Sequence, residues 1–424
     1  MARTRNNNRN GRVDVSPQLS RKSSDRLGRY YTDTGIGSLL VNQLGVDSPA
    51  NVIDLGAGHG VLSMAAAKRW SKCQLITVDV DHQSRLELSR KFSSDGMHRH
   101  IRTSALDWRL PEKVKSVAGV VDAGVCNPPF ILPKWRDEYV DILRDAGFDR
   151  VPSVAGHIEA PAIFFAQNMR IIGDGGHLGI ILPDSLISSK RYRWFRESLL
   201  LKYRVHRVVK LPRRSFRGTD ALAHIVVMEK SKPVGDGVEL AVFRDGKLQD
   251  ELTVSRDQAA DRMDCEYHRS LAQPRRASSN PARSIGSIGS VVRGSIENHV
   301  AKAKGIDVVH TTNIPSETCS RWSDFPIFEC GKNGAAVDKY NFAEAGDILL
   351  ARVGRNLELK LIGVSSGRVL ITDCVYRIRV QEEYRDALLL SLGSERGRAW
   401  LRSQCYGVSA AQLPKSALLN FSFE

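Results

Sequence analysis

The sequence predicts an α/β protein with a doubly wound sheet, followed by a second domain that is rich in β-structure. Three observations support this fold class. Strand-like and helix-like segments alternate from Asn51 onward. A glycine-rich turn, Asp54-Leu-Gly-Ala-Gly-His-Gly60, closes the first strand and opens the first helix. After Ser287 the pattern changes to short apolar segments separated by turns.

The elements of the first domain follow from hydrophobic periodicity. Continuous apolar runs are typical of strands that are buried on both faces, and longer segments with apolar residues three or four apart are typical of helices. We expect strands over 51–55, 74–79, 117–126, 175–183, 204–211 and 223–229, and helices over 60–70, 83–92 and 160–172.

Composition sets the domain boundaries. The 424 residues are too many for one typical domain. Residues 1–25 are polar and rich in Asn, Arg and Ser, which predicts a basic disordered tail. We expect the α/β domain to span 26–235, a linker region to span 236–285, and a β-rich α+β domain to span 286–424. Within this last domain the pattern predicts helices over 384–392 and 397–402.

The chain is strongly basic, with a net charge of +15 and a pI near 9.6. Residues 187–217 carry eleven Lys and Arg side chains against one acid, Glu197, a local charge of +10. Aromatic residues are interleaved with them, which favours nucleic acid as the partner, although a generally basic solvated surface is the alternative. The expected phosphate contacts are Lys190, Arg191, Arg193, Arg213, Arg214 and Arg217.

Several classes of protein are excluded. No apolar run reaches the roughly 18 residues that a membrane helix needs, and the basic N-terminus lacks the apolar core of a secretory signal. The seven cysteines are scattered without Cys-x-x-Cys or Cys/His ligand spacing. We therefore expect a cytoplasmic protein with reduced thiols, no membrane association and no zinc or other metal site.

The glycine-rich turn predicts a nucleotide-like cofactor. Asp54 ends the strand, and glycines at 56, 58 and 60 let the backbone turn tightly and approach a ligand closely. The turn alone does not identify the cofactor, because enzymes that bind dinucleotides use similar turns.

Acidic residues after the next two strand positions make this prediction more specific. Asp79 ends the second strand, where its carboxylate can accept hydrogen bonds from both hydroxyls of a ribose. Asp107 and Trp108 follow the third strand position, where an acid and an aromatic ring can hold an adenine. The alternatives are that Asp79 caps a strand end and that Trp108 belongs to the core.

The tetrad Asn127-Pro128-Pro129-Phe130 follows a strand and is suited to hold a planar amine. The nitrogen of an aromatic amine is a poor nucleophile because its lone pair is delocalised into the ring. Hydrogen bonds from the amine to the Asn127 side-chain oxygen and the Pro128 carbonyl would draw the nitrogen towards tetrahedral geometry. The two prolines fix the backbone, and Phe130 can stack on the ring. The chemistry is therefore mostly positioning and electrostatics.

Turn and tetrad, in this order, resemble the amino-methyltransferases that depend on S-adenosylmethionine (AdoMet). The segment Arg29-Tyr-Tyr-Thr-Asp33 resembles the Tyr-Thr-Pro segment of gamma-group DNA N6-adenine methyltransferases, with Asp33 where the family often has proline. The resemblance covers about residues 26–230 and implies a Rossmann-like methyltransferase domain, in which Thr32 covers the methionine end of AdoMet. Leu211-Pro-x-x-x-Phe216 resembles a family loop, which implies that Phe216 stacks on an extruded base.

The C-terminal part is similar to a target recognition domain of type I specificity subunits. Segments 346–354, 363–366 and 407–414 carry this likeness, and residues 262–267 resemble the segment that often precedes such a domain. The resemblance implies a stand-alone modification enzyme that acts on double-stranded DNA as a monomer. It also implies a cognate restriction endonuclease as the functional partner.

Other functions stay open at this point. Methyltransferases acting on RNA guanine N2 or on a release-factor glutamine use a closely related tetrad, but they predict an RNA-binding appendage or a small helical domain. A DNA-binding specificity protein with an inactive methyltransferase fold is a further alternative, against which the intact set of Asp54, Asp79, Asp107 and Asn127 argues. The tetrad does not decide between adenine N6 and cytosine N4, and the recognition sequence depends on a few loop side chains.

Overall fold

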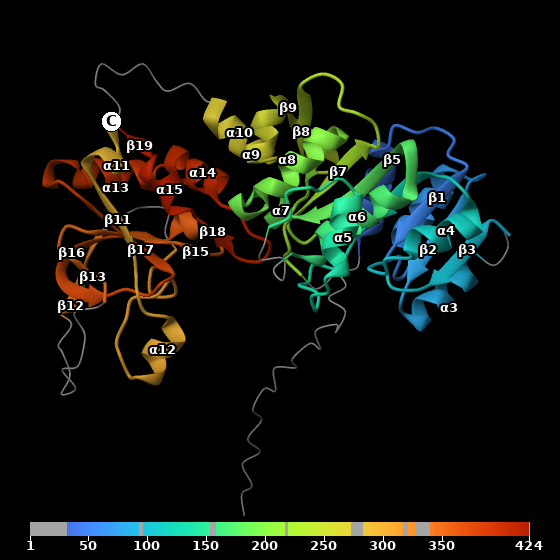
Figure 1. The fold of residues 1–424 in the computed structure, drawn as a ribbon. Coiled ribbons are helices and arrows are strands. Elements are labelled where there is room, and N and C mark those ends of the chain that lie inside the picture. Colours follow the sequence, from blue (N-terminus) through green and yellow to red (C-terminus); the bar gives the residue numbers. More distant parts are fainter. Residues whose placement is uncertain are drawn as a thin grey trace, which may run out of the picture.

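The structure is a computed structural model that describes residues 32–92, 96–152, 158–216, 219–272, 283–316, 321–327 and 340–423. Two domains lie side by side in it, the first coloured blue to yellow and the second orange to red (Figure 1). The predicted N-terminal tail and Arg217 lie outside the described residues. No helix in the described ranges is both long and apolar enough to cross a bilayer.

A nine-stranded sheet forms the centre of the first domain, in the order β3-β2-β1-β4-β5-β7-β6-β8-β9. The first five strands along the chain run parallel, and β7 pairs antiparallel with both β5 and β6. The strands are β1 (Asn51–Leu55), β2 (Gln74–Asp79), β3 (His98–Arg102), β4 (Val121–Cys126), β5 (Ile172–Pro183), β6 (Arg204–Lys210), β7 (Ala223–Glu229), β8 (Gly237–Arg244) and β9 (Lys247–Ser255).

Helices cover both faces of this sheet, so two separate apolar cores form. One core includes side chains of α1 (Thr34–Gln43), α2 (Val61–Arg69) and α3 (His82–Lys91). The other includes side chains of α4 (Leu110–Ala118), α5 (Glu138–Asp145), α6 (Ala160–Ile171) and α8 (Arg193–Lys202). This arrangement confirms the predicted doubly wound α/β class.

Two predicted boundaries are wrong. The strand expected over 117–126 begins only at Val121, because α4 continues to Ala118 and Gly119, with φ of 70°, ends it. The linker expected over 236–285 contains β8 and β9, which extend the first sheet, and then α9 (Arg256–Asp261) and α10 (Cys265–Ala272). The edge strand β9 misled the prediction because most of its residues are partly exposed and polar. The first domain therefore continues to about residue 272.

The second domain is the β-rich α+β unit that the sequence predicts. Its main sheet has the order β11-β17-β14-β16-β12, and β13 also pairs with β16. These strands are β11 (Gly289–Arg293), β12 (Trp322–Ile327), β13 (Phe342–Glu344), β14 (Ile348–Ala351), β16 (Leu361–Leu370) and β17 (Val375–Val380). The two predicted helices are present as α13 (Arg385–Gly393) and α14 (Glu395–Gln404), and shorter elements are α11 (Ile285–Ile288), α12 (Asn298–Ala303) and α15 (Lys415–Leu419).

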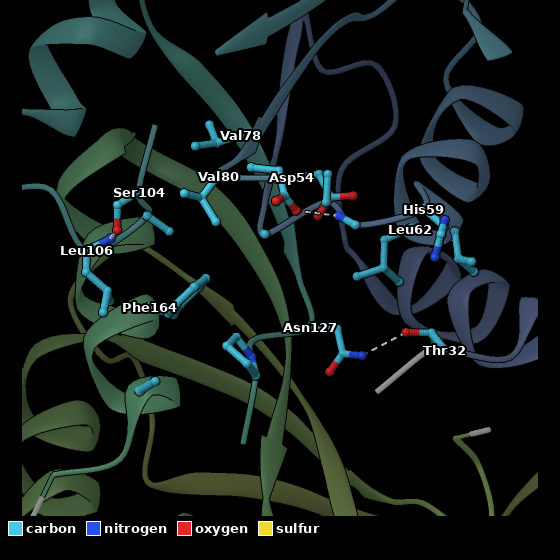
Figure 2. Close-up of a pocket in the computed structure, with 18 of the residues that line it drawn as sticks. Thr32, Asp54, His59, Leu62, Val78, Val80, Ser104, Leu106, Asn127 and Phe164 are labelled. Carbon is cyan, nitrogen blue, oxygen red and sulfur yellow. Dashed lines mark hydrogen bonds between the residues drawn. The ribbon is translucent and has the colours of Figure 1, made fainter. Parts of the chain in front are cut away.

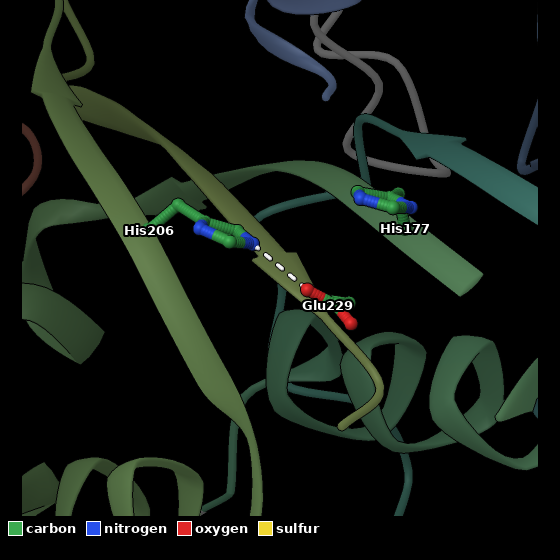
Figure 3. Close-up of side chains that lie close together, drawn as sticks. All are labelled: His177, His206 and Glu229. Atoms are coloured by element: carbon green, nitrogen blue, oxygen red, sulfur yellow. Dashed lines mark ion pairs between the residues drawn. The ribbon is translucent and has the colours of Figure 1, made fainter. Parts of the chain in front are cut away.

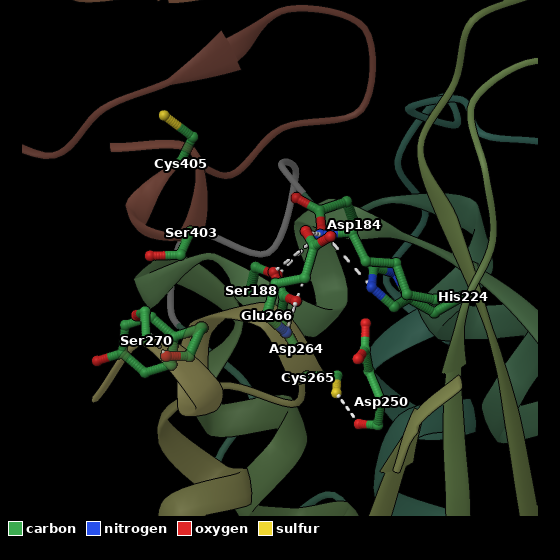
Figure 4. A network of polar contacts seen from close by, with 12 residues as sticks. Asp184, Ser188, His224, Asp250, Asp264, Cys265, Glu266, Ser270, Ser403 and Cys405 are labelled. Atoms are coloured by element: carbon green, nitrogen blue, oxygen red, sulfur yellow. Dashed lines mark hydrogen bonds and ion pairs between the residues drawn. The ribbon is translucent and has the colours of Figure 1, made fainter. Parts of the chain in front are cut away.

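A buried polar network joins the two domains (Figure 4). Asp264 is buried between Lys210 and Arg262. Its burial would raise the carboxyl pKa, but these two cations together hold the pKa of Asp264 well below its usual range. Arg262 also donates to the carbonyl oxygens of Gln404 and Cys405 in the second domain. The segment 262–267 therefore bridges the domains.

Candidate active site

A pocket opens where the parallel strands of the first sheet end, which is the edge at which doubly wound sheets bind ligands (Figure 2). The turn after β1, the end of β2, the loop after β3 and the tetrad after β4 all contribute to it. Its lining includes Thr32, Asp54, Gly56, Gly58, Asp79, Ser104, Leu106, Asn127, Pro129 and Phe164.

The three glycines of the turn have left-handed backbone conformations. Gly56, Gly58 and Gly60 have φ of 75°, 50° and 77°. The first two line the pocket, but Gly60 does not; it precedes α2, where an added Cβ would lie 2.4 Å from a methyl carbon of Leu88 in α3. Gly60 therefore permits close helix packing, and Gly56 and Gly58 present the backbone to the pocket.

Asp54 lies at the base of this turn and is almost fully buried. Burial raises the pKa of its carboxyl to about 7, and a hydrogen bond of 2.6 Å from the Ser63 hydroxyl partly offsets that effect. Ser63 was not among the predicted site residues. Its only signal in the sequence is a small hydroxyl residue one turn into the helix that follows the glycines.

Asp79 ends β2, lines the pocket and is 6% exposed. One carboxylate oxygen accepts from the Gly58 backbone N–H and the other from the Asp81 N–H, each at 2.8 Å. A carboxylate oxygen has two lone pairs, so each can accept a further hydrogen bond. The two backbone bonds hold the carboxylate in one orientation at the pocket.

Asp107 and Trp108 are not brought into the pocket. The Asp107 carboxylate accepts from Lys113 Nζ at 2.5 Å, a bond that holds its pKa below the usual range. The Trp108 ring lies under the Arg170 guanidinium, 3.9 Å from it. The loop after β3 does line the pocket, but through Ser104 and Leu106. Phe164 of α6 lines the pocket as well. A single sequence gives no sign of which of these neighbouring residues points inward.

The Asn127 side chain is held in a defined orientation. Its Nδ2 donates to the Thr32 hydroxyl at 2.8 Å, across 95 positions of sequence (Figure 2). In this orientation the amide oxygen is the atom that can accept a hydrogen bond from an amine in the pocket. Asp33, where the resembling family often has proline, caps α1 by accepting from the Gly35 N–H at 2.8 Å. The cap explains why Asp is compatible with this position.

The remaining tetrad residues lie beside the loop that carries Phe216. Pro129 lines the pocket, whereas Pro128 is buried behind it. Phe130 contacts Phe216 edge to face, with ring centroids 6.2 Å apart. Phe216 is only 2% exposed and also pairs with Thr32 in a β-bridge. The structure thus places Phe216 in the core next to the site, and not with its ring face open to a base.

The predicted phosphate-binding residues that the structure describes are all exposed, but other cations of the same stretch are not. Lys190, Arg191, Arg213 and Arg214 are exposed. Arg193 is exposed as well, but its guanidinium pairs with both Glu197 and Asp261. Other cations of the same stretch are internal: Arg196 is fully buried and donates to four backbone carbonyls, and Lys210 pairs with Asp264. The positive surface is therefore smaller than the local charge predicts.

Comparison with known proteins relates the pocket to methyltransferases. Residues 29–143 match the family model of the methyltransferase small domain. The chain is 24% identical over 223 residues to the type II methyltransferase M.CvrRI of Paramecium bursaria Chlorella virus XZ-6E, covering 52% of this chain and 53% of that protein. It is 25% identical over 256 residues to the type II methyltransferase M.BsuBI of Bacillus subtilis, covering 55% and 49%. The chain thus spans about half the length of these curated relatives.

Two further comparisons concern the catalytic half and the whole fold. A tRNA1(Val) (adenine(37)-N6)-methyltransferase of Flavobacterium psychrophilum is 25% identical over 138 residues, covering 32% of this chain and 54% of that protein. The crystal structure of the type IIG restriction endonuclease BpuSI covers 93% of this chain and 59% of its own, with a TM-score of 0.50 and 12% identity. The fold of both domains, and not only that of the first, therefore has a counterpart in a solved structure.

Proposed function

We propose that this protein is a site-specific DNA methyltransferase of a restriction-modification system, which transfers a methyl group from AdoMet to the N6 amine of adenine in double-stranded DNA. The observation that carries the proposal is the oriented Asn127 amide at the edge of a pocket that also contains Asp79 and the glycine-rich turn. The similarity to two type II methyltransferases supports methyl transfer.

The pocket residues fit AdoMet. The left-handed turn at Gly56 and Gly58 brings bare backbone to the pocket, and an added Cβ at Gly56 would lie 3.1 Å from the Phe164 ring that also lines it. The oriented carboxylate of Asp79 would accept from the ribose hydroxyls, and Leu106 and Phe164 offer apolar surface for the adenine ring. Thr32 would lie near the methionine end. When bound, AdoMet supplies an electrophilic methyl group, and the chain itself contributes binding and orientation.

The tetrad would hold the amine that is methylated. The Asn127 amide oxygen and the Pro128 carbonyl accept the two amine hydrogens, which draws the nitrogen lone pair out of the ring plane. Because the amine loses its proton as the methyl group arrives, no strong base is needed, and positioning accounts for most of the rate. The target base must leave the duplex to reach this site, and Phe130 would stack on it there.

Exposed cations where the two domains meet would bind the DNA backbone. Lys190 donates to the Ser416 hydroxyl of the second domain, and Arg214 and Arg355, one from each domain, both pair with Asp220. Phosphates would compete for these side chains. The second domain, from 286 onward, would read base edges as a target recognition domain. We further propose a cytoplasmic monomer with a cognate restriction endonuclease as its functional partner.

A second candidate is methylation of adenine N6 in RNA. The similarity to a tRNA adenine methyltransferase favours it, but that similarity is confined to about a third of this chain. The pocket and tetrad suit adenine in either nucleic acid, and the tetrad alone also suits cytosine N4 or a glutamine amide. The second domain favours DNA, because its fold has a counterpart in a type IIG restriction endonuclease.

The test is to express the chain in cells that lack adenine methylation and to sequence their DNA with detection of modified bases. We expect N6-methyladenine at one short sequence motif. The Asn127→Ala variant should leave DNA unmodified while the purified protein still binds AdoMet. Unmodified DNA together with methylated cellular RNA would favour the second candidate, and methylation that persists in Asn127→Ala would refute the proposed role of the tetrad.

A further inference from the structure

Three side chains of types that can bind a metal come together from three adjacent strands (Figure 3), and none of them lines the cofactor pocket. They are His177 in β5, His206 in β6 and Glu229 in β7, and one ligand atom of each lies within 4.8 Å of the other two. His177 and Glu229 are direct partners across the strand pair, so their side chains share one face of the sheet.

His206 lies on the same face of the sheet. Arg204 pairs directly with Glu229, and His206 follows Arg204 two residues later along β6. The register then shifts between Val205 and Arg207, so that His206 is the extra residue of a β-bulge. The His206 ring stacks parallel to that of His177 with centroids 6.2 Å apart, and its Nε2 lies 3.4 Å from a carboxylate oxygen of Glu229. That buried Nε2 makes no hydrogen bond to any described residue.

The site lies away from the strand ends at which the pocket opens. His177 pairs with Ala123 in β4, three residues before the end of that strand, whereas the tetrad follows the strand end at Cys126. The end of α1 is tied to the same region, because Arg207, next to His206, donates to the Gln43 side chain at 2.9 Å. An ion bound here would act on the stability of the sheet and not on the methyl transfer itself.

We propose that His177, His206 and Glu229 form a zinc site that links the strands β5, β6 and β7. Two imidazoles and one carboxylate are ligands that zinc accepts, with a water as the fourth. Tetrahedral zinc needs ligand atoms about 3.3 Å apart, so small side-chain rotations would close the present arrangement. The absence of Cys-x-x-Cys and Cys/His spacing predicts no zinc site; that prediction did not consider these three side chains, which are far apart in the sequence.

A neighbouring cation, Arg204, allows a further test of whether Glu229 is a zinc ligand. Arg204 lies 3.7 Å from the Glu229 carboxylate, and its positive charge opposes zinc at the same oxygen. If zinc binds, removing this charge with Arg204→Gln should strengthen binding. If the carboxylate serves only to pair with Arg204, the same change should leave zinc binding as weak as before.

The experiment uses the untagged full-length protein, freed of metal with a chelator and titrated with Zn²⁺ by calorimetry. We expect one zinc per chain and a Tm that rises with zinc concentration. Zinc binding should be weakened at least about 100-fold in His177→Gln and in His206→Gln, because losing a ligand should cost more affinity than losing an outer-shell partner. His299→Gln is the matched control, since His299 is an exposed surface residue 3.3 Å from Glu297 in the second domain; it should bind zinc as the wild type does.

Two results would overturn the proposal. One is the absence of stoichiometric zinc binding by the wild-type protein, a result that needs no variant. The other is unchanged affinity in both histidine variants. The Tm of each metal-free variant must match that of the metal-free wild type, and Glu229→Gln, which keeps the side-chain size, replaces any histidine variant that fails this check.

Discussion

The hydroxyl of Thr32 should be a positioning group for the Asn127 amide. It accepts from Asn127 Nδ2 at 2.8 Å, and Thr32 is only 8% exposed. Thr32→Val removes this hydroxyl but keeps the β-branched shape of the side chain. The variant therefore tests the hydrogen bond with little change in packing, and we expect it to lower the rate of methyl transfer.

The size of the effect follows from the contact. A neutral hydrogen bond contributes about 0.5–1.5 kcal/mol net, and a buried donor left without its acceptor costs about 1–3 kcal/mol. Asn127 is partly buried, so we take about 1–3 kcal/mol as the loss of transition-state positioning. At about 1.4 kcal/mol per factor of ten, kcat should fall roughly 5- to 150-fold.

Single-turnover transfer of labelled methyl groups from AdoMet to a duplex that carries the target site measures this rate, and equilibrium titration measures AdoMet binding separately. In the Asn127→Ala background, Thr32→Val should have no further effect, because the group that it orients is gone. Two outcomes would refute the reasoning: an unchanged kcat, or rate losses that multiply in the double variant. Weaker AdoMet binding with an unchanged rate would assign Thr32 to the cofactor alone.

Three further predictions follow from the site. Asp79→Ala should weaken AdoMet binding by about 1.5–3 kcal/mol through lost charge-assisted hydrogen bonds, measured by equilibrium titration. Burial raises the pKa of Asp54 from 3.8 to about 7, so the folded state binds more protons than the unfolded chain between these pH values. The free energy of unfolding should therefore fall as the pH rises from about 4 to about 7. Denaturant titrations should find this pH dependence weakened in Asp54→Asn. Replacing Arg213 and Arg214 by alanine should reduce the salt dependence of DNA binding by up to about 2 in the log–log slope. Arg193→Ala should change it less, because Arg193 pairs with two acids, whereas Arg214 pairs with one and Arg213 donates to a backbone carbonyl.

Each of these predictions has a result that contradicts it. An AdoMet dissociation constant that Asp79→Ala leaves unchanged would remove the ribose assignment. Equal pH dependence of stability in the wild type and Asp54→Asn would mean that Asp54 titrates near its ordinary pKa when folded. A salt slope that Arg193→Ala lowers as much as the double variant does would mean that pairing with acids does not withhold an arginine from DNA.

The turn and the tetrad could be located from the sequence because their signals are local. The left-handed turn at Gly56 and Gly58 needs glycine, and an Asn-Pro-Pro tetrad directly after a buried strand predicts its own position at the edge of the sheet. Neighbouring residues on an irregular loop are different. Asp107 and Leu106 are adjacent in sequence, but only Leu106 lines the pocket, and backbone geometry that no pattern encodes decides between them.

Charge was predicted less well because ion pairs form in space. The stretch 187–217 has one acid of its own, but acids from distant parts of the chain neutralise several of its cations. Asp261 pairs with Arg193, and Asp264 with Lys210. These partners come from the region that the sequence suggested was a linker. One misassigned segment thus produced two errors, a missing pair of edge strands and an overestimated positive surface.

The same region limits how the division of labour between the domains can be tested. Asp184 at the end of β5 accepts from the Gly407 N–H at 2.6 Å, and Arg262 reaches Gln404 in α14. A chain cut after residue 272 would remove these partners and open to solvent the surface around Asp184 and Arg262 that is now buried, which should destabilise the fragment. Loss of methylation in such a fragment would then report unfolding as readily as loss of target recognition. Exchange of the second domain for that of a related enzyme, with the residues that contact Asp184 and Arg262 retained, distinguishes unfolding from loss of target recognition. A changed methylation motif would mean that the second domain selects the target. An unchanged motif would mean that the first domain does.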